Sequence, residues 1–202
     1  MILGICGACQ AGKSTVADML CDLNPEYKSY SFADALKEEV SKTYPKEELG
    51  WNGKDWTGPK SVSGRAQLNK RAEKERKENP ACFLNVVKDK IEQEKPIIAV
   101  IADVRFINEL EWVSEEGNVV LVRNQRKEKE YIDNFLLKGD YHESELQWRV
   151  WIASKSENSV WTNTRKGYIV IHNNDSLDDL RQRVFDLDYS LTFWRLALCA
   201  FP

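Results

Sequence analysis

The sequence predicts an α/β fold in which a parallel β-sheet is flanked by helices. Three observations predict it: short apolar segments alternate with helical segments, the segment 96–102 is apolar throughout, and a glycine-bounded turn joins the first apolar segment to the first helix. Strands that alternate with helices form parallel sheets, and strands covered on both faces are apolar throughout. The 202 residues, 42% apolar and 30% charged, suffice for one globular domain or at most two small ones.

Five segments have the apolar or alternating composition of strands: 1–6, 28–32, 96–102, 119–122 and 167–172. Helices are expected between and after them: 13–23, 33–43, 65–78, a helix that starts at Asn79-Pro80, 106–116, and a helix that follows Asp175 or Ser176. Four helices carry apolar stripes, made of Val16, Leu20 and Leu23, of Phe83, Val87 and Ile91, of Phe106, Leu110 and Val113, and of Leu177, Leu180 and Val184. Asn24-Pro25 and Gly117 are stop signals, and Asn79-Pro80 combines an N-cap with a first-turn proline.

Two long stretches interrupt this alternation. Residues 44–64 are rich in glycine and proline and contain Trp51 and Trp56, and residues 123–166 are polar and charged. Long irregular stretches in a compact domain are usually functional loops. The expected organisation is a single domain with a core of 1–43, 96–122 and 167–185, an acceptor-binding insertion at 44–95, and a lid at 123–166.

Composition excludes several classes of partner. The formal net charge of −3 argues against a protein that binds nucleic acid polymers, which needs a basic face. No run of about 18 apolar residues is present, and the first residues lack the features of a signal peptide. We therefore expect a cytoplasmic protein that does not enter a membrane and whose five cysteines are reduced. The apolar segment 189–202 fits either a final helix packed on the domain or a subunit contact in a homodimer.

The glycine-bounded turn carries a specific motif. Residues 7–14 read Gly-Ala-Cys-Gln-Ala-Gly-Lys-Ser, which matches G-x-x-x-x-G-K-[ST] between a strand and a helix. Such a P-loop wraps a polyphosphate with backbone N–H groups at a helix N-terminus, which carries partial positive charge. Its lysine bridges the β- and γ-phosphates, and the following hydroxyl binds Mg²⁺. The residues expected to bind ATP are Gly7, Ala8, Cys9, Gln10, Ala11, Gly12, Lys13, Ser14 and Thr15.

The same turn contains a C-x-x-C pattern, Cys6-Gly-Ala-Cys9, which is also found in redox and zinc sites. A zinc site would need a second pair of ligands, and the two histidines, His142 and His172, lie far apart in the sequence. We therefore interpret Cys6 as a residue that fills the end of a strand and Cys9 as a loop side chain.

Asp103-Val104-Arg105 follows the apolar segment 96–102. A carboxylate at the end of a strand next to a phosphate loop is placed to hold Mg²⁺, so Ser14 and Asp103 are the expected metal ligands. Arg105 offers either a bidentate donor to a reacting phosphate or a surface ion pair.

Other nucleotide-binding classes fit the sequence poorly. A signalling GTPase has Asp-x-x-Gly after this strand and Asn-Lys-x-Asp later, whereas Asp103 is followed by Val-Arg-Phe and Asn69-Lys70 by Arg-Ala. Transporter and motor ATPases are usually longer. A small-molecule kinase is the expectation that remains.

Three further segments follow the phosphate loop in order. They are Ser31-Phe-Ala-Asp-Ala-Leu-Lys37, Asp103-Val-Arg-Phe-Ile-Asn-Glu-Leu-Glu-Trp112 and His142-Glu-Ser-Glu145, with Gln67, Arg76, Pro80 and Phe83 between the first two. The ordered set resembles the phage-type deoxynucleoside monophosphate kinases over roughly residues 1–180. Many members of that family have Lys-Asp where this chain has Lys13-Ser14.

The resemblance implies a P-loop NTPase fold of the nucleoside monophosphate kinase type, located in the host cytoplasm if a phage encodes it. The implied reaction transfers the γ-phosphoryl group of ATP to a (deoxy)nucleoside 5′-monophosphate with the help of Mg²⁺. Because the acceptor phosphate is already an anion, positioning and charge neutralisation suffice, and no general base is required. The residues implied in catalysis are Lys13, Arg105 and Arg126, with Arg123 at the adenine or in the lid. The residues implied at the acceptor are Lys37, Trp51, Trp56, Arg65, Arg76 and Glu145.

Several of these residues have an alternative explanation. Trp51 and Trp56 fit base stacking or core packing, Lys37 fits a solvated helix lysine, and Glu145 fits a carboxylate at a helix start. The acceptor also stays open, because animal phosphomevalonate kinases share a similar layout that includes an Arg-x-x-x-Pro segment like residues 76–80. The non-enzymatic alternative is a nucleotide-binding module that has lost phosphoryl transfer.

Overall fold

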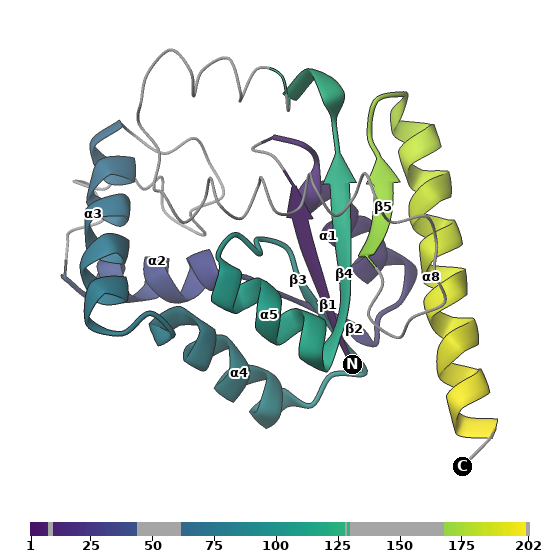
Figure 1. Ribbon diagram of the computed structural model, residues 1–202, viewed down its shortest axis with the longest axis horizontal. Helices are drawn as coiled ribbons and strands as arrows, with labels where there is room; N and C mark the ends of the chain where they lie inside the picture. The colour runs from purple at the N-terminus through teal and green to yellow at the C-terminus, as the bar shows by residue number, and fades with distance from the viewer. Residues whose placement is uncertain (8–9, 44–61, 128, 130–167, 201–202) are drawn as a thin grey trace. The chain divides into compact units, whose positions relative to one another are not determined.

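The structure of the protein is a computed structural model of the 202-residue chain (Figure 1). It describes residues 1–7, 10–43, 62–127, 129 and 168–200, and within these it describes 39–43, 62–67, 168 and 193–200 by their backbone alone. The chain forms two compact units, one made of Met1–Ser29 and Pro96–Pro202 and the other of Tyr30–Lys95. Among the described residues, no helix combines the length and the apolar character that crossing a bilayer requires.

A five-stranded sheet organises the first unit. Its strands are β1 (Ile2–Gly7), β2 (Tyr27–Tyr30), β3 (Ile98–Ile101), β4 (Gly117–Arg123) and β5 (Tyr168–His172), in the spatial order β2-β3-β1-β4-β5. The pairs β1–β3, β1–β4 and β4–β5 are parallel, with Leu3 opposite Val100 and Cys6 opposite Leu121. All five predicted strands are present, and their bounds differ from the prediction by at most two residues at either end.

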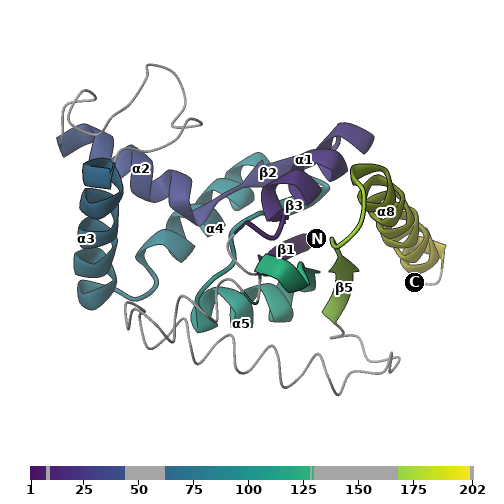
Figure 2. The same cartoon turned by 90° about the horizontal axis from the view of Figure 1, so that it is seen from above.

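Helices of the first unit cover both faces of the sheet (Figure 2). The helices α1 (Lys13–Leu23) and α8 (Leu177–Ala200) contact each other and share a core cluster with Leu3 and Ile5 of β1. The helix α5 (Ile107–Glu116) lies on the opposite face, where a Cβ added to Gly4 would lie 2.5 Å from Val113 Cγ1. Alternate residues of β1 therefore face different helical layers, as the pleat of a strand requires.

The chain leaves the neighbouring strands β1 and β3 toward opposite faces of the sheet. β1 continues into α1, whereas β3 continues into α5. In sheets of parallel strands, ligands bind beyond the C-terminal ends of the strands where the connections reverse in this way. The topology therefore puts the loop after β1 and the loop after β3, residues 7–12 and 102–106, at the expected ligand position.

Two details of the first unit differ from the sequence prediction, and a third concerns the segment for which the sequence left open a packed final helix or a subunit contact. Leu23 is predicted to face inward but is 45% exposed, because α1 ends there and its last turn runs past the buried Val16 and Leu20. Phe106, predicted as the first inward residue of its helix, is instead the N-cap of α5. The segment 189–200 is a continuation of α8, in which Leu191 joins the core cluster.

The second unit contains three helices among its described residues: α2 (Phe32–Thr43), α3 (Val62–Glu78) and α4 (Cys82–Glu94). α2 contacts both of the others, and the Tyr30 hydroxyl donates a hydrogen bond to Glu94 Oε2 at 2.9 Å. The predicted N-cap of α4 is wrong. The helix starts two residues later, at Ala81 and Cys82, because the Asn79 side chain accepts a hydrogen bond from the Ala81 N–H at 3.0 Å and forms a turn before the helix.

Candidate active site

The loops that follow β1, β3, β4 and β5 form the candidate site. We call this region the C-terminal end of the sheet and define it by the described residues of 7–15, 102–106, 123–127 and 172–176. All of them belong to the first unit. Because parallel strands end on the same side of a sheet, four loops that are distant in sequence meet here.

The described part of the phosphate loop has the backbone of a tight turn. Gly7 has a φ of 146°, and a Cβ added to it would lie 2.3 Å from the carbonyl oxygen of Val122. Gly12, the N-cap of α1, has a φ of 99° in the left-handed region, where glycine is favoured. The predicted ligands Ala8 and Cys9 lie outside the described residues, whereas Gln10 is exposed and Ala11 is buried.

Lys13 folds back over this loop. It is the first residue of α1, and its Nζ donates a hydrogen bond to the carbonyl oxygen of Gly7 at 3.0 Å. The first turn of α1 contains no acidic residue, so no carboxylate there opposes the positive end of the helix dipole. The ammonium group and the start of the helix together make this loop attractive to an anion.

Two oxygen donors are available for a cation. Asp103, 9% exposed, is the second residue after β3, and Ser14 is an exposed residue of the first turn of α1. The Val104 N–H donates to the carbonyl oxygen of Ile5 at 3.2 Å, which joins the loop that carries Asp103 to β1. Among the described residues, no group of three or more histidine, cysteine, aspartate or glutamate side chains could hold a metal ion. The two oxygen donors Ser14 and Asp103 fit Mg²⁺, which takes one or two protein oxygens and fills its other positions with phosphate oxygens and water.

The segment that carries Arg105 is held by a residue that the sequence analysis missed. Glu109 is 3% exposed, and its Oε2 accepts hydrogen bonds from the backbone N–H groups of Arg105 at 2.8 Å and Phe106 at 3.0 Å. Arg105 itself is exposed. The available signal was the position of Glu109 three residues after Phe106, where a glutamate closes a capping box.

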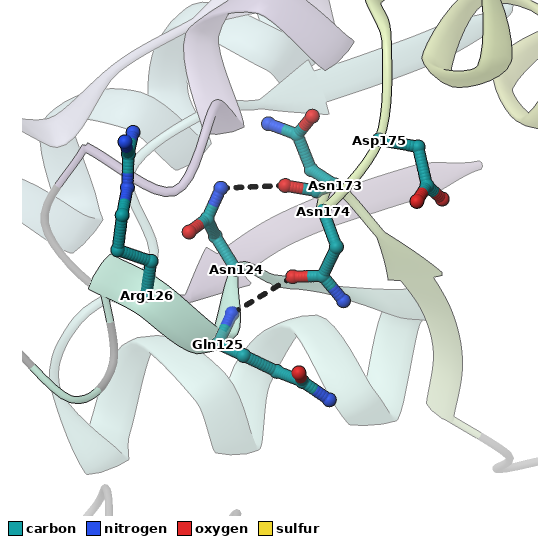
Figure 3. A pocket seen from close by; sticks show the side chains of 6 residues that line it. All are labelled: Asn124, Gln125, Arg126, Asn173, Asn174 and Asp175. Carbon is teal, nitrogen blue, oxygen red and sulfur yellow. Dashed lines mark hydrogen bonds between the residues drawn. The ribbon is translucent and has the colours of Figure 1, made fainter.

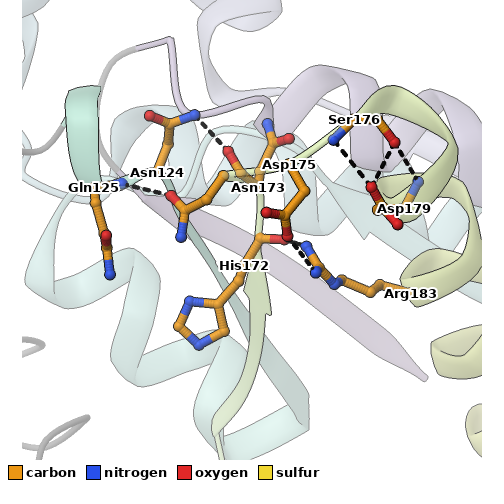
Figure 4. Close-up of polar contacts among 9 residues, drawn as sticks. Asn124, Gln125, His172, Asn173, Asp175, Ser176, Asp179 and Arg183 are labelled. Atoms are coloured by element: carbon orange, nitrogen blue, oxygen red, sulfur yellow. Dashed lines mark hydrogen bonds and ion pairs between the residues drawn. The ribbon is translucent and has the colours of Figure 1, made fainter.

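Asparagine side chains that the sequence analysis also missed join the loop after β5 to the phosphate loop and to the loop after β4. Figure 4 shows the contacts between the loops after β4 and β5. Asn173 Nδ2 donates to the carbonyl oxygen of Ala11 at 2.8 Å. The backbone N–H of Asn173 donates to the Arg123 carbonyl at 2.7 Å, and Asn124 Nδ2 donates to the Asn173 carbonyl at 2.5 Å. No motif marks these residues, because the contacts join positions that are 49 to 162 residues apart.

A polar pocket of about 510 Å³ lies beside these contacts (Figure 3). Its lining comes from the loops after β4 and β5 and consists of Asn124, Gln125, Arg126, Asn173, Asn174 and Asp175. The Gln125 N–H donates to Asn174 Oδ1 at 2.9 Å, and Arg183 Nη2 lies 2.5 Å from Asp175 Oδ2. Arg126 is exposed at the pocket, and Arg123 is the half-buried last residue of β4.

Cys6 lies at the end of β1 with no exposed surface. Burial raises the pKa of its thiol to about 12, although the positive charge of Lys13 opposes this shift. A thiol with a raised pKa forms little thiolate at neutral pH, and the thiolate is the form that reacts and binds metals. Cys6 therefore has the properties of a buried core residue rather than of a redox or zinc ligand.

The predicted acceptor residues belong to the second unit or lie outside the described residues. Lys37 and Arg76 belong to the second unit, where Lys37 Nζ lies 2.5 Å from Asp34 Oδ1 and the Arg76 guanidinium lies 4.8 Å from the centre of the Phe83 ring. Arg65 lies in α3, whose first residues are described by backbone alone. The remaining three, Trp51, Trp56 and Glu145, lie outside the described residues.

Comparison with known proteins places the fold in a class. No family model and no curated protein matches the sequence. Among solved structures, the chain is similar to a dephospho-CoA kinase from Campylobacter jejuni, with a TM-score of 0.52 and 15% identity over 96% of this chain and 98% of that one. It is also similar to the Thermus thermophilus protein TT1252, with a TM-score of 0.50 and 18% identity over 95% and 97% of the two chains. Together with the phosphate loop at the end of β1, these similarities show that the chain has the α/β fold of the P-loop kinases.

Proposed function

We propose that this protein is a Mg²⁺-dependent phosphotransferase that moves the γ-phosphoryl group of ATP to a (deoxy)nucleoside 5′-monophosphate. The observation that carries the proposal is the joint position of the phosphate loop and Asp103 at the reversal between β1 and β3. A phosphate loop that is followed by a helix supplies the anion site, and a carboxylate at the next strand supplies the cation site.

In this proposal the residues of the chain mainly bind and orient. The backbone N–H groups of residues 7–14 and the Lys13 ammonium hold the phosphates of ATP. Ser14 and Asp103 hold Mg²⁺, which, when bound, neutralises charge on the β- and γ-phosphates. The adenosine part fits the adjacent pocket lined by Asn124 and Asn173, where Arg126 or Arg123 contacts it or the phosphates.

The assignment of the acceptor rests on the sequence segments quoted above. An acceptor phosphate repels the γ-phosphate, so cations are needed to bring the two anions together. Arg105, Arg76 and Lys37 are proposed for this role, with Arg65, Glu145, Trp51 and Trp56 as further acceptor contacts. Closure of the insertion and the lid would exclude water and thereby suppress ATP hydrolysis.

Two alternative acceptors are included in the test. Phosphomevalonate is the alternative that the sequence layout leaves open. Dephospho-CoA is the second, because the chain aligns over 96% of its length with a dephospho-CoA kinase. Both are phosphorylated small molecules, so the chemistry of the phosphate loop does not discriminate among them.

The test is a coupled assay of ADP release with the complete chain, ATP and Mg²⁺. The acceptors are the (deoxy)nucleoside monophosphates, phosphomevalonate and dephospho-CoA, and reactions without acceptor or without Mg²⁺ are the controls. We expect acceptor-dependent ADP release with at least one nucleoside monophosphate. Release only with phosphomevalonate or dephospho-CoA would keep the phosphotransferase and replace the acceptor. Tight binding of ATP without release for any acceptor would identify a non-catalytic nucleotide-binding module.

A further inference from the structure

Asn173 contacts the phosphate loop at the Ala11–Gly12 peptide, which ends at the N-cap of α1. Its Nδ2 donates to the Ala11 carbonyl oxygen at 2.8 Å, and a Cβ added to Gly12 would lie 2.4 Å from the same Nδ2. The orientation of the side-chain amide is unambiguous, because only the NH₂ group can face a carbonyl oxygen favourably. The side chain of Asn173 is thus packed directly against the Ala11–Gly12 peptide.

This contact determines which way the peptide faces. In a trans peptide the C=O and N–H groups point in opposite directions, so holding the Ala11 carbonyl toward Asn173 turns the Gly12 N–H away from it. Gly12 is the N-cap of α1, and the N–H groups at the start of a helix have no partner within the helix. With a φ of 99° at Gly12, the peptide sits in a conformation that few residues adopt without support.

The backbone of Asn173 is held independently of its side chain. Its N–H donates to the Arg123 carbonyl at 2.7 Å, and its carbonyl accepts from Asn124 Nδ2 at 2.5 Å. The loop after β5 therefore keeps two hydrogen bonds to the end of β4 when the side chain is removed. The amide of Asn173 serves a separate purpose, which is its contact with Ala11.

We propose that Asn173 is a positioning residue that orients the Ala11–Gly12 peptide so that the Gly12 N–H is presented to the triphosphate. The proposal rests on the proposed ATP site and adds a residue to it. Because Asn173 also lines the polar pocket, it links the part of the site proposed for adenosine to the part that holds the phosphates. Because the hydrogen bond of its amide goes to the phosphate loop, loss of that amide should weaken the binding of phosphate groups more than the binding of the nucleoside alone.

The experiment measures, by calorimetry in the presence of Mg²⁺, the affinity of the complete chain for inorganic tripolyphosphate, for ATP and for adenosine. Asn173→Ala removes the donor without adding charge. Asn173→Asp puts a carboxylate against the Ala11 carbonyl. Asn174→Asp adds the same charge one residue later, where the new carboxylate can still accept the hydrogen bond from the Gln125 N–H. Asn118→Ala is the matched control, because Asn118 lies at the other end of β4, where its Nδ2 lies 3.8 Å from Met1 Sδ. Circular dichroism verifies that each variant is folded.

We expect Asn173→Ala to lower the affinity for tripolyphosphate and for ATP about tenfold. This factor corresponds to the loss of one well-placed hydrogen bond together with its effect on the loop. The affinity for adenosine should fall by a smaller factor than the affinity for tripolyphosphate. Asn173→Asp should lower the affinity for tripolyphosphate more than Asn174→Asp does, and Asn118→Ala should match the wild type. Unchanged tripolyphosphate affinity in Asn173→Ala, or an equal loss for adenosine, would overturn the proposal while the ATP site stands. A wild-type chain that binds neither tripolyphosphate nor ATP would overturn the proposed function itself, and this proposal with it.

Discussion

The two ends of the same sheet are held in different ways. We call the described residues 1–2, 97–98 and 117–118 the N-terminal end of the sheet. There, main-chain groups contact each other: the Met1 amino group donates to the Ile97 carbonyl at 3.2 Å, and a Cβ added to Gly117 would lie 1.9 Å from the Ile2 carbonyl oxygen. At the C-terminal end, side chains contact the main chain, as Lys13 does at Gly7 and Asn173 at Ala11.

This difference indicates how the fold divides stability from function. Main-chain contacts between strands hold the sheet together but present no chemistry. Side chains that hold loop peptides determine which N–H and C=O groups a ligand meets, and they can do so without being catalytic themselves. We therefore expect substitutions at the N-terminal end to change stability alone, and substitutions that alter the phosphate loop or the residues in contact with it to change ligand binding or turnover.

The largest expected effect comes from Lys13→Ala. The substitution removes the ammonium group that is held at the loop. Because loss of a group that stabilises charge in the transition state lowers turnover strongly, kcat should fall by about a thousandfold. The thermal unfolding midpoint should stay close to that of the wild type, because Lys13 is only half-buried. Lys90→Ala, which removes an exposed lysine of α4, is the control and should retain full turnover. Retained turnover in Lys13→Ala would remove the basis for the site.

A smaller loss of turnover is expected for Asp103→Asn. The amide has nearly the same shape but no charge, so the affinity for Mg²⁺ should fall and kcat should decrease by about a hundredfold. The measurement is kcat as a function of Mg²⁺ concentration, with Asp89→Asn, an exposed residue of α4, as the control. An unchanged Mg²⁺ dependence would mean that Asp103 does not hold the metal.

A pair of glycine substitutions compares the two ends directly. Gly117→Ala and Gly7→Ala each put a Cβ within 2.3 Å of a carbonyl oxygen, so both should lower the free energy of unfolding by about 1–3 kcal/mol. Gly7→Ala should also lower the specific activity of the folded protein, because its φ of 146° shapes the phosphate loop. Denaturant unfolding and assays at a temperature where both variants are folded provide the test. A loss of specific activity in Gly117→Ala as large as in Gly7→Ala would contradict the division between the two ends.

The smallest effect is expected at the start of α8, where a polar contact at the C-terminal end of the sheet serves stability. Ser176 Oγ accepts a hydrogen bond from the Asp179 N–H at 3.2 Å, so Ser176→Ala should cost about 1 kcal/mol of unfolding free energy at pH 7. Ser190→Ala is the control. Ser190 Oγ donates a hydrogen bond to the Asp186 carbonyl within the same helix, so its loss should cost at most a few tenths of a kcal/mol of unfolding free energy.

The contact between Ser176 and Asp179 also contributes to the free energy of unfolding in a way that depends on pH. Hydrogen bonds from Ser176 hold the pKa of Asp179 below its ordinary value of 3.8. A carboxyl group whose pKa is lowered on folding stabilises the protein above its unfolded pKa and loses that contribution as the pH falls through the folded pKa. The stability difference between the wild type and Ser176→Ala should therefore narrow below about pH 4. A difference that stays constant or widens with acid would contradict the contact between Ser176 and Asp179.

Much of the fold was predictable from local sequence. Apolar or alternating segments predicted all five strands. β1 and β3 are apolar throughout, as strands covered on both faces must be, whereas in β2 buried tyrosines flank exposed polar residues. The helix bounds failed where a local contact outweighed the pattern. Asn79 forms a turn with Ala81 before α4 instead of capping the helix. For residues 189–200 the sequence left open a packed final helix or a subunit contact; they continue α8, and Leu191 joins the core cluster.

In the candidate site, the sequence predicted residues that belong to a contiguous motif or follow a recognisable strand. The phosphate loop is one such motif, and Asp103 follows a recognisable strand, so Lys13, Ser14 and Asp103 could be named as candidates from order alone. Their roles stay predictions, as do those of the acceptor residues. Glu109 was missed although its capping-box position three residues after Phe106 is a local signal. Asn173 was missed because it acts on the main chain of a segment 162 positions away, and a single sequence does not reveal which carbonyl or N–H group a side chain will meet.

The sequence by itself determined the alternation of strands and helices and the presence of a phosphate loop, since hydrophobic periodicity and a glycine-bounded turn are properties of neighbouring residues. Only the tertiary structure decided the strand order, the position of Asp103 beside the end of β1, and the hydrogen bond from Asn173 to Ala11 across 162 positions. The physical reason is that these contacts form when the strands are assembled side by side, and the energy that selects one assembly comes from the packing of the whole core.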